Sequence, residues 1–383
     1  MDLSISQLDF PTVNPLSSQK IFDKYNEVNR LIIIGNGFDL AHGLKSSFKD
    51  FIYNYCYKVL SQFLTNMHYE DFFISIHSKI HISDGIEFIS KMEPQNAFEK
   101  FITLHTNSYI QLDWKTPFFS SIFKDVKNKN WVDIEIKYFD HLKEIKNTNN
   151  QTSIDELNAE FEFIKTEFLN YLQGEVVKNN FIPTNELLTQ FRQTIKSRET
   201  QPNTIKGNKT PEKICILNFN YTNIAETYSK EMNLKKTTYI PIHGQLLGDD
   251  NKVQAPVFGF GDEVDPDYEQ FELLRNDNLF THIKSFKYLQ FNHYRNLLQF
   301  IEDNPYQIQI FGHSCGISDR TLLKTIFEHE NCISIKPYYF ESEGSNDYVP
   351  KSYSISRHFK SKSELRNKVV NEKYCEPMFQ PPK

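Results

Sequence analysis

The chain has 383 residues, enough for one large domain with an insertion or for two domains. Hydrophobic residues make up 39%, and 33 Phe and 20 Tyr add bulky apolar surface, so we expect a sizeable core. The net charge of −6 gives no general attraction to nucleic acid or to an anionic membrane, and no apolar run approaches the ~18 residues of a membrane span. Five cysteines without a C-x-x-C pair predict neither a disulfide framework nor a metal site, and they fit a cytoplasmic protein.

The first predicted strand, Leu31–Ile34 (LIII), leads directly into the glycine-rich turn GNGFD of residues 35–39. Glycines let a backbone approach a ligand, and free amides at a helix start attract phosphate. A plain strand-to-helix turn in which Asp39 caps the helix fits the same residues. His42, one helical turn later, either faces the same cleft or is a packed or solvated histidine of the helix.

A long segment of different character separates this strand from the next one. Apolar residues at helical spacing predict helices over Phe51–Phe63 and Asn185–Ile195. Ser153–Glu156 (SIDE) is a capping box that predicts the start of another helix, and Gly174 is expected to end it. We therefore predict a mainly helical insertion over residues 55–210.

Further compact apolar runs predict buried strands at Ile214–Leu217 (ICIL), Tyr239–Ile242 (YIPI) and Ile308–Phe311 (IQIF). A fifth, Cys332–Phe340, contains Pro337, which suits the edge of a sheet. Each of the first four strands is followed by a polar turn, namely GNGFD, NFNYTN, HGQ or GHSCG. In an open parallel sheet, ligands bind at the carboxyl ends of the strands, where such turns gather.

The predicted fold is therefore α/β, a Rossmann-like, mostly parallel sheet with a large helical insertion. The expected parts are an N-terminal arm (1–30), a nucleotide-binding core (31–54 and 211–340), the insertion (55–210) and a C-terminal extension (341–383). Because the ligand site of such a core is built by its turns, the functional residues are expected there, and the sequence assigns no role to the insertion.

The late turn Gly312–Gly316 (GHSCG) matches G-x-S-x-G, which presents a nucleophilic serine in α/β-hydrolases. That interpretation makes Ser314 the nucleophile and needs an acid and a histidine after it. The candidates are Asp319 or Asp347, and His329 or His358. The chain ends at residue 383, which leaves little room for the strands and helices that this fold places after its serine.

The alternative interpretation of this turn is a binding loop. Gly312, Ser314 and nearby amides would form a concave nest for phosphate or ribose. Asp319 would cap the next helix or hold the loop, and Cys315 would be a small buried residue.

Four segments together resemble the bacteriophage abortive-infection AbiH family: LIIIGNGFDLAHGL (31–44), NFNYTN (218–223), IHG (242–244) and FGHSCGISD (311–319). This resemblance implies a role in defence against phage. The order of a glycine-rich turn, an N-Y-D-like turn, an H-G pair and a late G-x-S turn is also similar, more distantly, to sirtuin-like NAD-binding domains. The second resemblance implies NAD as the ligand.

In sirtuin-like domains, the asparagine of the N-Y-D turn binds the nicotinamide ribose and positions water, and the histidine of H-G acts as general base. The matching residues are Asn220 and His243. Thr222 stands where those domains have an acidic residue, so no role follows for that position. Histidine is the side chain whose ordinary pKa suits a base near neutral pH, and an amide can both donate to and accept from ribose hydroxyls.

The resemblance thus implies a sirtuin-like effector that takes NAD as its substrate and hydrolyses the nicotinamide–ribose bond, without a metal. Asn220 and His243 are the expected catalytic residues. Contacts with the nucleotide are expected from Gly35, Asn36, Gly37, Asp39, Tyr221, Gly244, Gly312, His313, Ser314 and Asp319. A homo-oligomer or a regulatory partner protein is expected to restrain such an effector. Two other functions stay open, a non-catalytic sensor of NAD or ADP-ribose and a serine hydrolase with Ser314.

Overall fold

The computed structural model describes residues 27–79, 92–124, 126, 131–146, 151–178, 181–202, 204–232, 235–246 and 256–381. Most of the predicted N-terminal arm, residues 1–26, lies outside them. At the centre is a five-stranded parallel sheet of order β6-β5-β1-β7-β8. Its strands are β1 (Asn29–Ile34), β5 (Ile214–Asn218), β6 (Thr237–Pro241), β7 (Tyr306–Phe311) and β8 (Cys332–Tyr338). All five predicted strands are confirmed to within a few residues, and β8 lies at an edge as Pro337 suggested.

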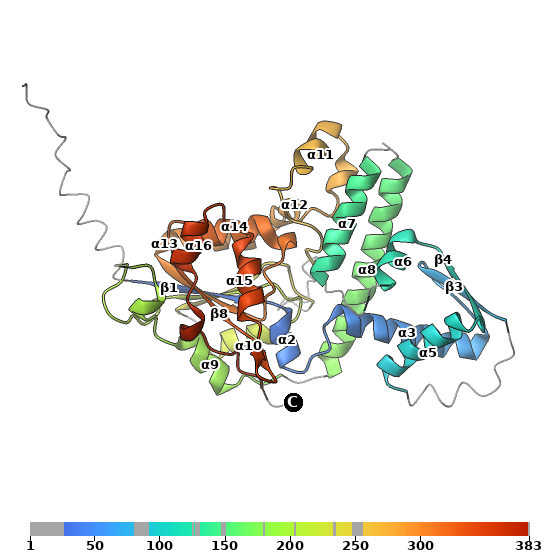
Figure 1. The fold of residues 1–383 in the computed structure, drawn as a ribbon, viewed down its shortest axis with the longest axis horizontal. Coiled ribbons are helices and arrows are strands. Elements are labelled where there is room, and N and C mark those ends of the chain that lie inside the picture. Colours follow the sequence, from blue (N-terminus) through green and yellow to red (C-terminus); the bar gives the residue numbers. More distant parts are fainter. Residues whose placement is uncertain are drawn as a thin grey trace, which may run out of the picture.

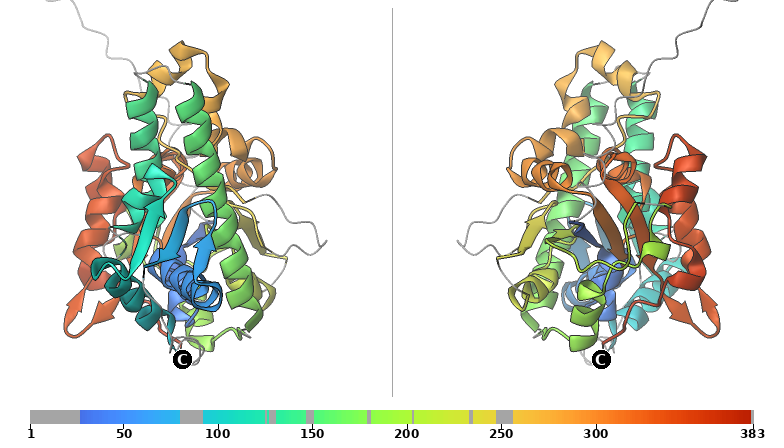
Figure 2. Two further views of the ribbon diagram at one scale, coloured as in Figure 1. Left: turned by 90° about the vertical axis from the view of Figure 1, so that its right-hand side faces the viewer. Right: turned by 90° about the vertical axis from the view of Figure 1, so that its left-hand side faces the viewer.

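Helices cover both faces of this sheet (Figure 2). Those packed on one face are α2 (Asn36–Ala41), α9 (Asn185–Arg192) and α10 (Ile224–Lys230). Those packed on the other are α13 (His293–Asp303), α14 (Arg320–Glu328) and α15 (Tyr348–Ser356). Along β1, Leu31 and Ile33 join the second core while Ile32 and Ile34 join the first. Burial on both faces explains why the strands are continuous apolar runs, and the predicted α/β class is confirmed.

The strand order creates a switch point between β1 and β7. The chain passes from β1 outward to β5 and β6, returns to β7 and then moves outward to β8. Ligands of open α/β sheets bind at such a point, because the loops after its two strands leave in opposite directions. The registers bring the strand ends level, with Ile34 beside both Phe311 and Asn218, and Asn218 beside Pro241. The four polar turns therefore begin at one edge of the sheet.

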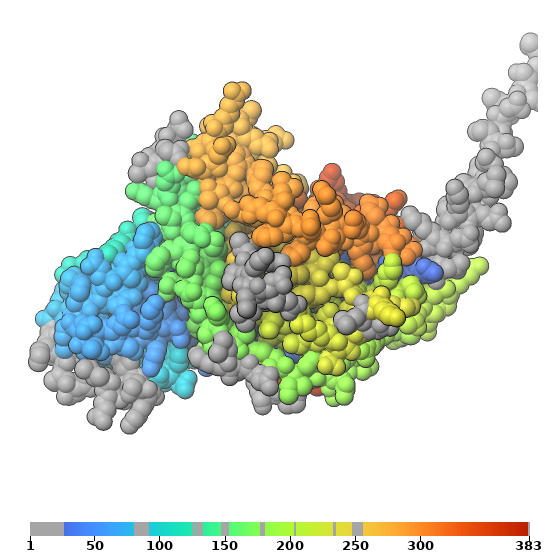
Figure 3. Space-filling model, turned by 180° about the vertical axis from the view of Figure 1, so that it is seen from behind, coloured from blue at the N-terminus to red at the C-terminus, as the bar shows by residue number. Residues whose placement is uncertain are grey.

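The region between β1 and β5 builds a separate, aromatic-rich core, called the aromatic core below. Its elements are α3 (Phe48–Asn66), β2 (His68–Glu70), β3 (Ile74–Ser78), α5 (Pro94–Thr106), β4 (Ile110–Trp114), α6 (Pro117–Phe123), α7 (Trp131–Lys146) and α8 (Gln151–Lys178). Strands β2, β3 and β4 form a small antiparallel sheet, which was not predicted because these strands are too short for a periodic pattern. Helices α7 and α8 stand between the main sheet and the outer part of this region (Figures 1 and 3).

The hydrophobic cores do not follow the predicted domain boundaries, which remain predictions. Helix α9 lies within the predicted insertion, yet its buried residues pack on the main sheet. Conversely, Phe258, Phe260 and Ile283 belong to the predicted nucleotide-binding core yet pack with α7 and α8. The elements of this later segment are α11 (Tyr268–Leu274), the 3-10 helix η3 (Asp277–Phe280) and α12 (Lys284–Tyr288).

The predicted C-terminal extension packs along β8. Its elements are the hairpin strands β9 (Glu341–Ser342) and β10 (Ser345–Asn346), then α15, α16 (Lys362–Lys368) and the 3-10 helix η5 (Glu372–Tyr374). The Val370 N–H donates to the Ile335 carbonyl at 2.9 Å, and the Met378 N–H donates to the Tyr339 carbonyl at 2.8 Å. Within the described ranges, no helix is both long and apolar enough to cross a membrane.

The predicted end of the long helix at Gly174 is wrong. Helix α8 begins at Gln151 and continues through Gly174 to Lys178. Phe168 and Leu172 before the glycine and Val176 after it are all buried. This packing outweighs the cost of about 1 kcal/mol that glycine brings to a helix interior.

Gly174→Ala should therefore stabilise the protein. A Cβ added there meets nothing within 4 Å, and alanine restrains the unfolded chain, so the free energy of unfolding should rise by about 0.5–1 kcal/mol. Urea unfolding measures this change. Gly207→Ala is the control, because Gly207 has a φ of +68° and alanine there should destabilise. Equal stability of Gly174→Ala and wild type would contradict a well-packed helix at this position.

Candidate functional site

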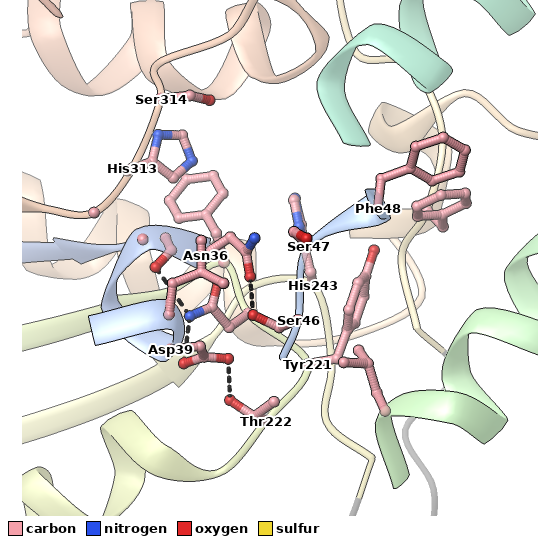
Figure 4. A pocket seen from close by; sticks show the side chains of 18 of the residues that line it. Asn36, Asp39, Ser46, Ser47, Phe48, Tyr221, Thr222, His243, His313 and Ser314 are labelled. Carbon is pink, nitrogen blue, oxygen red and sulfur yellow. Dashed lines mark hydrogen bonds between the residues drawn. The ribbon is translucent and has the colours of Figure 1, made fainter. Parts of the chain in front are cut away.

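A cavity of about 270 Å³ lies at the switch point, where the four polar turns meet the aromatic core. All the predicted site residues except Gly244 line it. Gly244 instead donates its amide hydrogen to the Pro241 carbonyl at 3.0 Å and shapes the turn with a φ of +79°. Figure 4 shows side chains of the first turn, the NFNYTN turn and the GHSCG turn around this space. Segments far apart in the sequence therefore meet as predicted.

Two glycine-rich turns touch backbone to backbone beside the cavity. The Gly37 N–H donates to the Gly312 carbonyl at 2.8 Å, and the Gly35 N–H donates to the Phe311 carbonyl at 3.0 Å. A Cβ on Gly312, whose φ is +66°, would lie 2.2 Å from the amide nitrogen of Phe38. Because the Gly35 and Gly37 amides are used within the protein, they are not free to bind phosphate. These glycines serve the close approach of the turns.

Asp39 fixes the amide of Asn220. The Asp39 carboxylate is buried and accepts from Asn220 Nδ2 at 2.8 Å and from Thr222 Oγ1 at 2.7 Å (Figure 4). Asn220 Nδ2 also donates to the Gly35 carbonyl at 3.1 Å, so both of its hydrogens are engaged and Oδ1 remains to accept a bond. Burial raises the pKa of Asp39 to about 7, against the lowering effect of its two hydrogen bonds.

Two predictions about the first turn are corrected or decided by this arrangement. Asp39 does not cap α2, whose N-cap is Gly35 without a side-chain bond. The acidic group missing at Thr222 is supplied to the NFNYTN turn by Asp39 instead. His42 is packed away from the cavity, with Nδ1 2.8 Å from the Phe38 carbonyl and Nε2 2.7 Å from Tyr228 OH.

His243 is buried just beyond β6, and its ring lies edge-on to the ring of Phe219. Its Nε2 lies 3.3 Å from Asp319 Oδ1 and 3.2 Å from Tyr288 OH. A carboxylate can only accept a hydrogen bond, so Nε2 carries the proton in the contact with Asp319. The other ring nitrogen, Nδ1, is then the unprotonated nitrogen of the ring, which can accept a hydrogen bond.

Asp319 is the centre of a buried charge network. It occupies the N-cap of α14 without a capping bond, so the capping role is wrong and its carboxylate serves the cavity instead. Oδ1 accepts from Lys284 Nζ at 2.7 Å, and Lys284 Nζ also lies 3.0 Å from Glu135 Oε1. Burial alone would raise the pKa of Asp319, but Lys284 and His243 hold it well below its ordinary value.

The pKa values of the other two members of the network respond differently to their burial. Burial lowers the pKa of Lys284, but the carboxylates of Asp319 and Glu135 outweigh it and raise that pKa. Burial raises the pKa of Glu135, and Lys284 only partly offsets this. The ammonium group therefore stays charged between its two carboxyl partners.

Several cavity residues had no signal in the sequence. Lys284 and Glu135 are single charged residues in helical patterns, and only the tertiary fold brings them to the cavity. Ser46 follows α2, and its Oγ donates to Asn36 Oδ1 at 2.5 Å (Figure 4). The remaining wall is apolar and comes mostly from the aromatic core, namely Phe48, Phe168, Leu172 and Phe258. Among the described residues, no group of three or more His, Cys, Asp or Glu is placed to hold a metal ion.

The GHSCG turn does not assemble a hydrolase triad in this structure. Ser314 is exposed, whereas His358 Nε2 is bound to the Cys315 carbonyl at 2.9 Å. His329 pairs with Glu302 at 3.2 Å, and Asp347 accepts from a backbone amide at 2.6 Å. Both candidate histidines therefore have partners other than Ser314.

The two neighbours of Ser314, His313 and Cys315, are buried. His313 Nδ1 accepts from the Cys315 N–H at 3.0 Å, and burial lowers the pKa of His313 to about 3, so its ring is neutral. Burial raises the pKa of the Cys315 thiol to about 12. The prediction that Cys315 is a small buried residue is confirmed.

The sequence matches the family described as bacteriophage abortive infection AbiH over residues 31–340. The chain belongs to the AbiH family. The matched range includes all four turns and the aromatic core, and it supports a role in abortive-infection defence against phage. Comparison with curated proteins finds no match. The sirtuin-like resemblance stays a prediction.

In this AbiH protein, Gly312→Ala should strongly destabilise the fold. Alanine would have to adopt a left-handed backbone conformation, and its Cβ would collide with the backbone of Phe38. Gly344 has a φ of +80° and open space where a Cβ would lie, so Gly344→Ala isolates the effect of the backbone conformation. We expect losses of about 3 kcal/mol for Gly312→Ala and about 1 kcal/mol for Gly344→Ala in urea unfolding. Equal losses would mean that the two turns are not in contact.

The buried Asp39 should make the AbiH protein less stable as the pH rises. Its pKa is about 7 in the folded protein against an ordinary 3.8, so the unfolded chain loses a proton that the folded chain still holds. Between these values each pH unit lowers the free energy of unfolding by about 1.4 kcal/mol. Asp39→Asn should flatten this decline when urea unfolding is repeated from pH 4 to pH 8. Parallel curves for variant and wild type would refute the assignment.

Proposed function

We propose that this AbiH protein hydrolyses NAD at the bond between nicotinamide and ribose, and that NAD depletion is its action in abortive infection. One observation carries the proposal. Asn220 and His243 follow the neighbouring strands β5 and β6, line one cavity, and each has one polar atom held by a buried carboxylate. Each is thereby left with a single acceptor atom for the ligand, Oδ1 of Asn220 and Nδ1 of His243.

These two acceptors suit hydrolysis of the nicotinamide–ribose bond. The bond from C1′ to the ring nitrogen breaks, its electron pair moves to that nitrogen, and neutral nicotinamide leaves. A water oxygen forms the new bond to C1′, and the proton of that water goes to Nδ1 of His243. Asn220 Oδ1 accepts from the water or from a ribose hydroxyl and so orients it.

The apolar wall of the cavity suits the leaving group. Phe48, Phe168 and Phe258 present aromatic surface to a flat ring. The nicotinamide ring of NAD is a pyridinium cation, which aromatic faces and the carboxylates of Asp319 and Glu135 favour. A cavity of about 270 Å³ holds a group of nucleoside size, so the adenosine half would extend outward past the exposed Ser314.

Incubation of the purified protein with NAD, followed by measurement of released nicotinamide, tests this proposal. Wild type should release nicotinamide, and His243→Ala and Asn220→Ala should lower kcat by about 100-fold or more because base and water lose their positions. His329→Ala and Asn331→Ala are the controls, since both residues lie outside the cavity. Both should keep the wild-type rate.

The outcomes separate the three candidate functions. Tight binding of NAD or ADP-ribose without nicotinamide release would contradict hydrolysis and favour the sensor. Labelling of Ser314 by a fluorophosphonate, lost in Ser314→Ala, would favour the serine hydrolase. Release that survives both His243→Ala and Asn220→Ala would place the chemistry elsewhere.

A further inference from the structure

We infer that Lys284 and Glu135 are positioning residues for His243, acting through Asp319, and that helix α7 is thereby part of the reaction machinery. The inference rests on the proposed role of His243 as the base. It assigns a task to two residues outside the four turns, one of them contributed by the region between β1 and β5.

The contacts form one unbroken chain. His243 Nε2 meets Asp319 Oδ1 at 3.3 Å, Asp319 Oδ1 meets Lys284 Nζ at 2.7 Å, and Lys284 Nζ meets Glu135 Oε1 at 3.0 Å. The four side chains come from four segments: the turn after β6, the 3-10 helix η4 (Ile317–Asp319), the start of α12 and the N-terminal half of α7. Each of the four residues exposes 5% or less of its surface.

Lys284 keeps Asp319 in its charged, correctly aimed form. A buried carboxylate without a cationic partner is costly and takes up a proton. A protonated Asp319 could donate to His243 Nε2 and so move the ring proton to Nδ1, where the base must be free. The lysine therefore protects the tautomer on which the proposed reaction depends.

Glu135 supplies a negative charge that balances Lys284. The charge of Asp319 is then left to balance a protonated His243. With Glu135, Lys284 and Asp319 all charged, the three groups sum to one negative charge, which becomes zero once His243 gains a proton. Without the Glu135 charge the same step would build a net positive charge in a buried site, which low dielectric penalises. Glu135 is itself held, since its Oε1 accepts from the Gly259 N–H at 3.2 Å.

The other groups around His243 do not supply this charge. Tyr288 OH lies 3.2 Å from Nε2, and burial raises the pKa of Tyr288 well above its ordinary value, so its hydroxyl is neutral. Burial does the same to Tyr221, whose ring also lies near the imidazole. His313 is neutral as well. Asp319, Lys284 and Glu135 are thus the charged groups that His243 meets among the described residues.

Proton NMR of the histidine rings during a pH titration tests the inference, with His243→Gln to assign the resonance. Glu135→Gln should lower the midpoint of the His243 titration by about one pH unit because a negative charge is lost, and Lys284→Met should lower it too because Asp319 then takes up a proton. The matched controls are Glu199→Gln and Lys336→Met, which break a buried ion pair of 3.3 Å outside the cavity. Both controls should leave the midpoint at its wild-type position.

The outcomes separate this inference from the proposed function. An unchanged His243 midpoint in Glu135→Gln overturns the inference, even if wild type hydrolyses NAD. Glutamine keeps the size of the glutamate side chain, so this test is valid even if Lys284→Met does not fold. Equal shifts of the His243 midpoint in Glu135→Gln and Glu199→Gln also overturn it, because loss of a buried carboxylate outside the cavity would then have the same effect. Failure of wild type to release nicotinamide overturns the proposed function alone, as the titration does not use NAD.

Discussion

The contact between two glycine-rich turns at the β1–β7 switch point is the constraint on which the rest of the site depends. Gly37 and Gly312 bring the backbones so close that a single Cβ would collide. This approach places the Asp39 carboxylate against the NFNYTN turn and the GHSCG turn beside the same cavity. Glycine here allows two protein segments to approach each other closely, whereas glycine-rich turns of this type are usually interpreted as phosphate-binding loops.

Two buried carboxylates each orient one polar side chain of the cavity. Asp39 and the Gly35 carbonyl accept hydrogen bonds from the amide hydrogens of Asn220, and Asp319 accepts one from Nε2 of His243. In each case a carboxylate helps to fix which atom of a neutral side chain is left as the acceptor. The aromatic core contributes the apolar wall and, through Glu135, the outer end of the charge network. An AbiH protein built this way cannot form its site from the parallel sheet alone.

Prediction from the sequence succeeded where a short segment carries its own physical signal. The five apolar runs became the five strands, and Asn220 and His243 reached the same cavity because parallel strands end at one edge. Prediction failed where tertiary packing decides. The helix through Gly174 is held by buried neighbours, and Lys284 lies 35 residues from Asp319 and 149 residues from Glu135 along the chain. No local pattern distinguishes Lys284 or Glu135 from a solvated charge.

The most direct test is a crystal structure of the His243→Ala variant with NAD. We expect the nicotinamide ribose to lie beside Asn220 Oδ1, with the nicotinamide ring against Phe168 and Phe258 and C1′ facing the position of the missing imidazole. Electron density for NAD at another place on the protein, with this cavity intact and empty, would contradict the claim that these segments assemble around a nucleotide.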